Sequence, residues 1–318
     1  MDLNKYLAAR DLVSNIGQPI LFVVVILSAL LLVFSFQKNL RKYSRHLVLG
    51  ISLFLGFGYT LLIWFHYQIY KFLPLINPQD GSLAGRYAIP VWIEDEKLFF
   101  WTFLISICLL LIKTKKASYQ IALNIVIVIF IFLTATTSNP FFSPLKDFHR
   151  EVGSIYQALS VSDVSIQMQI FTPAIGRLHG FYNSTYMWIH PPLLFIAYST
   201  FVISFVNVIF MLAQKSTDHE KAAYNWAKPG YIALTVGLLL GYPWAFDAWK
   251  GQPWWFSPKI NVTLMMWVLY TAYLHSRIYL HRKGMWTATG VIGLLSFVGV
   301  VATYLSTYVL PGIHSVGG

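Results

Sequence analysis

Residues 241–267 read GYPWAFDAWKGQPWWFSPKINVTLMMW. Two apolar runs, at about 229–246 and 260–280, overlap its ends, and each is long enough to cross a bilayer. The stretch therefore indicates two membrane helices joined by a short loop at the membrane surface. It contains five of the chain's eleven tryptophans, Trp244, Trp249, Trp254, Trp255 and Trp267. An interfacial belt needs only one or two such rings per helix end, so the cluster, with Phe256, predicts a platform for a large flat ligand such as haem. An interfacial anchor is the alternative.

The composition extends this interpretation to the whole chain. Of its 318 residues, 57% are hydrophobic and 11% are charged, whereas soluble domains carry about 25% charged residues. We predict an all-α, polytopic transmembrane bundle, treated as one domain over 1–318. Its lone cysteine, Cys108, excludes a disulfide framework, and no nucleic-acid motif accompanies the net charge of +11. The eight expected spans are about 16–36, 47–70, 98–112, 119–137, 187–213, 229–246, 260–280 and 286–309.

Basic residues in the short linkers predict the orientation. Lysines and arginines gather in segments 37–46, 113–118, 214–228 and 281–285, which lie on one side if the helices alternate. The positive-inside rule makes that side cytoplasmic. The outer side then holds loops 71–97, 138–186 and 247–259 and the tail 310–318, and we expect the membrane to be a bacterial or archaeal cytoplasmic membrane. Loop 138–186 is long enough to form a small ordered cap.

Two histidines share the predicted level of the tryptophan loop. His190 opens the fifth span in MWIHPPLLF, where prolines suit the first turn of a helix, and His314 lies in the outer tail. Two imidazoles beside an aromatic platform are what a six-coordinate haem iron needs. His190 and His314 are therefore the predicted ligands of an outer haem.

His275 lies about 22 Å along the seventh span, where an ionisable residue indicates function. We expect it to bind a second haem inside the membrane, with His46 or another subunit supplying the second ligand. For His66 a helix–helix hydrogen bond is the better interpretation. The remaining histidines are expected to be solvated, at His219 and His281, or to order the outer loop, at His149 and His179.

Three stretches carry a family resemblance: YMWIHPPLL at 186–194, the tryptophan loop followed by WVLYTAYLHSR at 267–277, and LPGIHSVGG at 310–318. They resemble the cytochrome c assembly family of membrane haem-handling proteins, which includes CcmF, CcmC and CcsA (ResC). IPVWIEDEKLFFW at 89–101 and SNPF at 138–141 are similar to CcmF more weakly. The order and spacing agree from about residue 87 onward.

The resemblance implies a cytochrome c haem lyase or synthase type of activity. His190 and His314 would bind the outer haem, a b-type substrate, and His275 an internal b haem. Trp244, Trp249, Trp254, Trp255 and Phe256 would leave the haem vinyl groups open to the thiols of an apocytochrome c CxxCH motif. The implied partners are apocytochrome c, membrane lipid and a CcsB/ResB-like or other assembly subunit, because the chain is shorter than a full CcmF.

The tryptophan loop departs from the family motif. Phe256, Ser257 and Pro258 stand where the family has Trp–Asp–Pro, and Lys259 and Ile260 follow without the usual acid. Ser257 can still cap the seventh span. Lys250 and Lys259 could pair with haem propionates. The loss of both acids favours an alternative, a haem exporter or chaperone without bond formation, and a b-haem subunit of a membrane redox complex is a further alternative.

Overall fold

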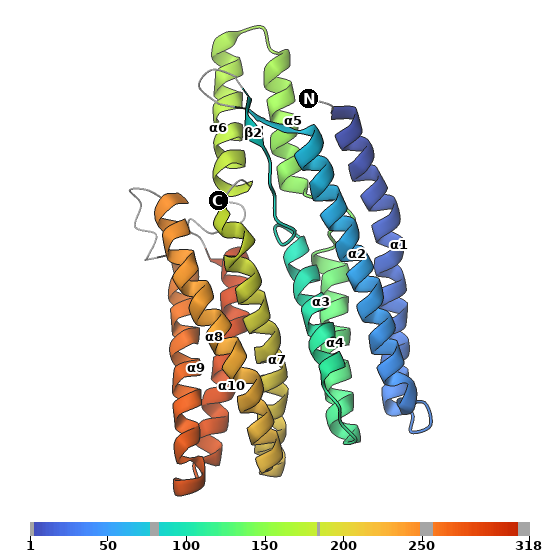
Figure 1. The fold of residues 1–318 in the computed structure, drawn as a ribbon, viewed down its shortest axis with the longest axis vertical. Coiled ribbons are helices and arrows are strands. Elements are labelled where there is room, and N and C mark those ends of the chain that lie inside the picture. Colours follow the sequence, from blue (N-terminus) through green and yellow to red (C-terminus); the bar gives the residue numbers. More distant parts are fainter. Residues whose placement is uncertain (1–2, 77–82, 183–184, 249–256, 311–318) are drawn as a thin grey trace. The chain divides into compact units, whose positions relative to one another are not determined.

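The computed structural model describes residues 3–76, 83–182, 185–248 and 257–310. These residues form ten α-helices, two short 3₁₀ helices and one two-stranded antiparallel ribbon (Figure 1). The chain divides into two compact units. Unit 1 comprises Met1–Leu110 and Asn124–Trp188, and unit 2 comprises Leu111–Leu123 and Ile189–Gly318. The single domain expected over 1–318 stays a prediction, and each unit is described by itself.

Unit 1 contains the helix pair α1 (Leu3–Phe36) and α2 (Ser44–Phe72), joined by η1 (Arg41–Tyr43). Its other elements are β1 (Pro74–Ile76), β2 (Leu83–Arg86), α3 (Glu96–Leu111), most of α4 (Ala117–Thr137), α5 (Lys146–Ser160), α6 (Val164–Tyr182) and η2 (Thr185–Trp188). The fully buried Phe141 ring lies against Gly17 of α1 and Gly58 of α2. A Cβ at Gly17 would collide with that ring, so the close approach depends on glycine.

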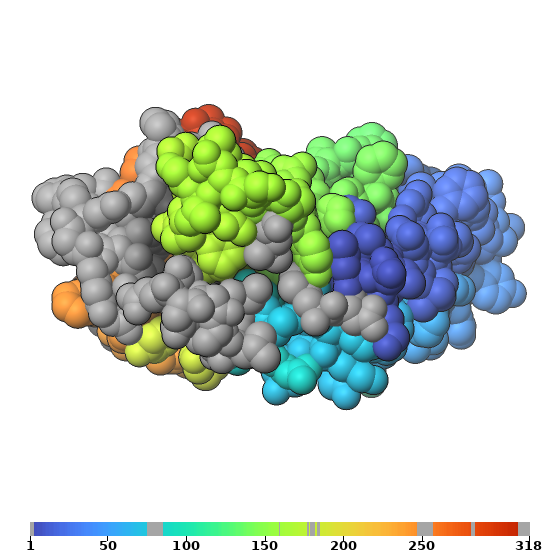
Figure 2. Space-filling view, turned by 90° about the horizontal axis from the view of Figure 1, so that it is seen from above, coloured from blue at the N-terminus to red at the C-terminus, as the bar shows by residue number. Residues whose placement is uncertain are grey.

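Helix α1 begins at Leu3, thirteen residues before the predicted start of the first span. Its 34 residues extend about 51 Å, well beyond the roughly 30 Å hydrocarbon core of a bilayer. The part of α1 that precedes the predicted span is polar, and contacts with the segment around α5 hold it in place. Arg10 donates to the Pro144 carbonyl at 3.0 Å, and Tyr6 hydrogen-bonds His149 at 3.2 Å. Figure 2 shows this end of α1, in dark blue, against green residues of the α5–α6 region.

Each of the eight predicted spans coincides with a helix. Six of these segments are long and apolar enough to cross a membrane: α1, η1–α2, α4, η2–α7, α8 and α10. Helix α3 is short, with 16 residues, and α9 has 26 residues but carries Lys, Arg and His near its end. The all-α membrane bundle is thus confirmed, and the count of eight is an approximate one.

The predicted cap in loop 138–186 is present as α5 and α6, which pack against each other. The β1–β2 ribbon in loop 71–97 was not predicted. Its register pairs Pro74 with Arg86, and the Arg86 guanidinium donates to the Lys71 carbonyl at 2.6 Å. Side-chain hydrogen bonding therefore ties the ribbon to the end of α2.

Unit 2 contains α7 (His190–Gln214), α8 (Thr217–Ala248), α9 (Pro258–Lys283) and α10 (Trp286–Val309). Helix α7 is more deeply buried than α8 or α10. Glycines permit close packing around it, since a Cβ at Gly230 of α8 or Gly290 of α10 would collide with α7 side chains. The helix that starts with His190 is therefore held on several sides.

Candidate functional site

His190 is the first residue of α7, as the sequence predicted. Ile189 occupies the N-cap position, and Pro191 and Pro192 lie in the first turn. Prolines cost little there because the first N–H groups of a helix have no intrahelical partner. The His190 side chain is half-buried and lies against α8.

Two glycines of α8 make room for the His190 ring. His190 Nδ1 donates a hydrogen bond to the Gly237 carbonyl at 2.6 Å. A Cβ on Gly241, one turn later, would lie 2.6 Å from Cε1 and 2.9 Å from Nδ1 of the ring. Leu194, one turn along α7, fits against Gly237 in the same way. The Gly237–Gly241 spacing thus forms a shallow groove for one face of α7.

Trp244 completes this arrangement. Its buried indole stacks on the His190 imidazole, with ring centroids 6.1 Å apart and an interplanar angle of 24°.

The hydrogen bond to Gly237 determines the tautomer of His190. A carbonyl only accepts hydrogen bonds, so this bond fixes the proton on Nδ1. Nε2 is then the nitrogen with the lone pair. A neutral imidazole, oriented through its other nitrogen, is the form that binds a transition-metal ion.

His275 has the same tautomer in a different setting. Its side chain is exposed on α9, and Nδ1 donates to the Thr271 carbonyl of the same helix at 2.7 Å. Tyr231 of α8 hydrogen-bonds the Thr271 hydroxyl at 2.8 Å, which aligns the two helices. Gly237 lies six residues from Tyr231 on α8, and His275 lies four residues from Thr271 on α9, on the other side of this hydrogen bond. Together these ten residues separate the levels of Gly237 and His275 by about 15 Å along the helix axes. His190 and His275 cannot share one iron.

Several predicted site residues lie outside the described residues: Trp249, Trp254, Trp255, Phe256 and His314, and also Lys250. The described chain resumes at Ser257, the N-cap residue of α9, whose side chain makes no capping hydrogen bond. Its carbonyl accepts the Asn261 N–H at 3.1 Å. Lys259, in the first turn, is close enough to His190 to act on it electrostatically.

The structure corrects one histidine and confirms another. His219, expected to be solvated, is 4% exposed and hydrogen-bonds Asn207 of α7 at 3.1 Å. It packs edge-on against Tyr119 of α4, a neighbour that is distant in sequence. His66 makes the predicted helix–helix hydrogen bond, because its Nε2 lies 2.7 Å from the Glu96 carboxylate at the start of α3.

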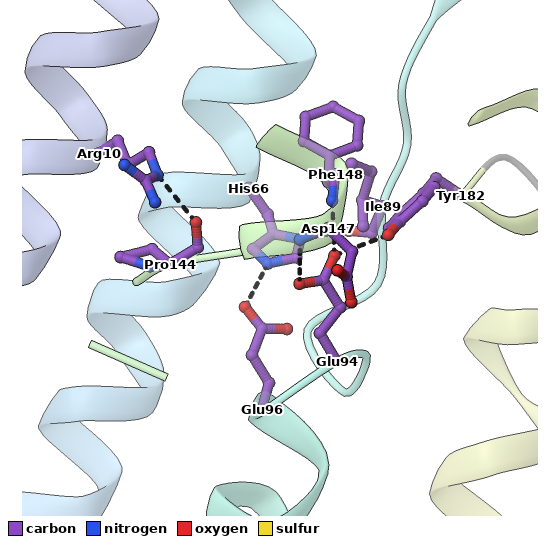
Figure 3. Close-up of polar contacts among 9 residues, drawn as sticks. All are labelled: Arg10, His66, Ile89, Glu94, Glu96, Pro144, Asp147, Phe148 and Tyr182. Carbon is purple, nitrogen blue, oxygen red and sulfur yellow. Dashed lines mark hydrogen bonds and ion pairs between the residues drawn. The ribbon is translucent and has the colours of Figure 1, made fainter. Parts of the chain in front are cut away.

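Sequence reasoning missed the acidic pair Glu94 and Glu96 in unit 1 (Figure 3). Glu94 has a positive φ of 45°, and its carboxylate accepts the N–H groups of Asp147 and Phe148 at 3.0 and 2.9 Å. It thereby caps the first turn of α5, and it also accepts the Tyr182 hydroxyl at 2.7 Å. Burial raises the pKa of Glu94, while these three hydrogen bonds act to lower it. The signal was a run of three acids, 94–96, at the start of an apolar helix.

Among the described residues, no group of three or more His, Cys, Asp or Glu side chains could hold a metal ion. A site for a bare metal ion is therefore absent from this part of the chain. The arrangement around His190 instead offers one neutral nitrogen ligand beside a stacked aromatic ring. A large planar metal complex that needs only axial protein ligands suits these groups.

Comparison with known proteins gives a consistent family. Residues 92–314 match the family model described as "Cytochrome C assembly protein". CcmF of Haemophilus influenzae is 23% identical over 96% of this chain and 47% of its own length. CcsA of Chlamydomonas reinhardtii is 27% identical over 51% of this chain and 48% of its own length.

A solved structure, "Cytochrome c Heme Lyase CcmF", shares the fold with a TM-score of 0.63 at 18% identity. The alignment covers 93% of this chain and 47% of that one. NrfE of Escherichia coli is 33% identical over 45% of this chain and 26% of its own length. The chain thus spans about half, or less, of the length of these relatives.

Proposed function

Because the chain belongs to the cytochrome c assembly family, we propose that it holds haem at the outer side of the membrane for attachment to apocytochrome c. The chain is an integral membrane protein, with six helices of spanning length and apolarity. The observation that carries the proposal is the His190 imidazole, fixed by Gly237 with Nε2 as its ligand nitrogen and stacked on Trp244. This geometry suits an axial ligand of haem.

In this proposal haem is the substrate. His190 and His314 supply the axial nitrogens, and Trp249, Trp254, Trp255 and Phe256 support the porphyrin face. Lys259 is placed to attract an anionic propionate near His190, an interaction that charge-assisted hydrogen bonds favour.

The proposed reaction is the addition of two cysteine thiols of a CxxCH motif across the two haem vinyl groups. Each sulfur bonds to the vinyl carbon beside the ring, and each thiol hydrogen goes to the outer carbon, so the addition consumes no oxidant. The chain's own residues contribute by positioning: they hold the iron, shield one edge of the ring and leave the vinyl edge open. The activity is therefore of the haem lyase type, and we propose that an assembly subunit of the CcsB/ResB kind takes part.

We further propose that His275 binds a second, b-type haem within the membrane. Its side chain is exposed, and its Nδ1 donates to the Thr271 carbonyl, which leaves Nε2 as the nitrogen with the lone pair. An exposed imidazole at such depth suits a ligand whose counterpart comes from another chain. The separation of about 15 Å from the level of Gly237 supports two independent haem sites.

One observation favours the alternative of a haem carrier without bond formation. Ser257 stands where the family motif has an acid, and Lys259 and Ile260 follow without the second acid. Both carboxylates of the motif are therefore missing from this loop. A haem carrier would keep the ligands and the aromatic platform but would not attach the haem.

A spectroscopic experiment tests both versions. The detergent-purified chain, expressed with ample haem, is measured oxidised and dithionite-reduced, and its haem is classified by the pyridine haemochrome. We expect a b-type spectrum that His190→Ala or His314→Ala changes. Incubation with an apocytochrome peptide and the assembly subunit should convert b-type into c-type haem. Haem binding without conversion would support the carrier, and a colourless protein would refute haem handling.

A further inference from the structure

Two side-chain hydrogen bonds fix the register of α8 against α9 within unit 2. The Tyr231 hydroxyl hydrogen-bonds the Thr271 hydroxyl at 2.8 Å, and the Trp267 indole N–H donates to the Thr235 hydroxyl at 3.0 Å. On each helix the second pair lies four residues from the first, toward the predicted outer side. The Tyr231 and Trp267 rings also stack, with centroids 5.9 Å apart at 18°. The two helices are therefore antiparallel neighbours that stay in register along this stretch.

The same register brings Lys228 and His275 to one level on the predicted cytoplasmic side of these contacts. Lys228 lies three residues from Tyr231 on α8, about 4.5 Å along the axis, and His275 lies four residues from Thr271 on α9, about 6 Å along the axis. Residues three and four apart share a face of a helix, so both lie beside the contact between the two helices. Both side chains are exposed. The proposed inner ligand thus has a lysine at its own level on the neighbouring helix.

The charges beside His275 leave one ammonium group without a counter-ion. Arg277 forms an ion pair with the buried Glu220. The Lys228 ammonium lies 4.7 Å from the centroid of the Tyr224 ring, and the Arg277 guanidinium carbon lies 3.9 Å from the same centroid. Among the residues that the structure describes, Lys228 has this cation–π contact and no ion pair. Of the two cations on Tyr224, only Arg277 is neutralised.

We propose that Lys228 binds a propionate of the haem that His275 holds, an inference that rests on the proposed inner haem. A haem carries its two carboxylates at one edge of the ring, and an ammonium group stabilises a carboxylate through a charge-assisted hydrogen bond. Lys228 belongs to the basic segment 214–228, which the positive-inside rule places on the cytoplasmic side. The anionic edge of the haem then faces the lipid headgroups and water, and the apolar part of the ring stays among the helices.

Two measurable consequences follow from this contact. An exposed ion pair changes a binding equilibrium by at most about fivefold, so the loss of the Lys228 charge should weaken the inner haem by about that factor. Reduction adds an electron to the iron, and a nearby cation favours the reduced form. Removal of the Lys228 charge should therefore also lower the midpoint potential of the inner haem.

The test follows the inner haem in nanodiscs of phosphatidylcholine, with haem loss to excess apomyoglobin and a redox titration as the two readouts. Lys228→Gln removes the charge at an exposed position, and we expect about fivefold faster haem loss and a lower midpoint potential. Lys228→Arg keeps the charge and should stay near the wild type. Lys221→Gln is the matched control, because Lys221 is exposed on the same helix about 10 Å further along the axis.

The possible results separate the lysine contact from the haem site itself. Equal behaviour of Lys228→Gln and Lys221→Gln, while His275→Ala still removes the haem component, would overturn the role of Lys228 alone. An effect of Lys228→Gln that appears only after phosphatidylglycerol is added to the nanodiscs would assign the ammonium to a lipid phosphate and overturn the propionate contact. A wild-type chain with no haem component that depends on His275 would refute the proposed inner haem, and the lysine contact with it.

Discussion

Gly241 is the position at which a single methyl group should disturb the outer site most directly. In Gly241→Ala the new Cβ would lie 2.6 Å from His190 Cε1 and 2.9 Å from Nδ1. Carbon atoms in ordinary contact are about 3.5–4.0 Å apart, so the ring must retreat by about 1 Å. The Nδ1 to Gly237 oxygen distance, now 2.6 Å, would grow to about 3.6 Å, beyond hydrogen-bond range.

The cost follows from these displacements. Overpacking costs about 1–3 kcal/mol and the lost hydrogen bond about 1 kcal/mol, while alanine in place of glycine returns about 1 kcal/mol of helix propensity. The fold should therefore survive a net loss of about 1–3 kcal/mol. The ligand should suffer more, because losing the partner that orients a metal-binding histidine lowers metal affinity about 10–100-fold.

Haem titration into the detergent-solubilised chain, followed at the Soret band, measures this effect. Gly237→Ala is the matched control, since its Cβ would meet the flexible Leu194 side chain at 2.9 Å instead of the imidazole. We expect Gly241→Ala to weaken haem binding at least tenfold more than Gly237→Ala. Equal losses in the two variants, or an unchanged affinity in Gly241→Ala, would refute the role assigned to Gly241 in placing the His190 ring.

His275→Ala should remove one haem component, and that component should remain in the outer-site variants His190→Ala and His314→Ala. A redox titration followed at the absorption bands of reduced haem resolves the two components. Loss of both components in His275→Ala would contradict the proposal of two sites. Glu96→Gln breaks the buried pair with His66 and should cost about 3–5 kcal/mol of unfolding free energy, whereas replacing both residues by apolar ones should cost less. Burial and then the nearby Arg10 lower the pKa of His149. The folded chain therefore binds fewer protons there than the unfolded chain, and this stability, present above about pH 6.5, is lost on acidification through the lowered pKa. His149→Gln should have a smaller fall in Tm between about pH 7.5 and 5, and parallel curves for both proteins would argue against this.

The apolar runs predicted which segments are helices, but not where two of them begin. Helix α1 starts at Leu3 and α8 at Thr217, each about twelve residues before the predicted span. Both extensions are polar, so hydropathy gives no sign of them. Tertiary partners hold them, as Arg10 does through the Pro144 carbonyl and Glu220 through its ion pair with Arg277.

The sequence predicts a solvent-exposed His219 because its neighbours in the sequence are charged, and local hydropathy does not reveal the tertiary partners of such a segment. Its actual environment comes from Asn207 on α7 and Tyr119 on α4, which no local pattern reveals. The acids of IPVWIEDEKLFFW were visible as carboxylates at the start of an apolar helix. Their roles depend on His66 and on the first turn of α5, which lie about thirty residues before them and about fifty after them.

Depth in the membrane sufficed to single out His190 and His275, and the structure adds what distinguishes them. Each donates Nδ1–H to a backbone carbonyl and keeps Nε2 for a ligand, but the acceptors differ in origin. Thr271 lies one turn before His275 on α9, so that hydrogen bond needs only the helix. Gly237 lies on the neighbouring helix, so the His190 tautomer depends on α7–α8 packing. The tautomer of the proposed inner ligand is thus set by local structure and that of the proposed outer ligand by tertiary structure, so glycine substitutions in α8 should discriminate between the two proposed sites.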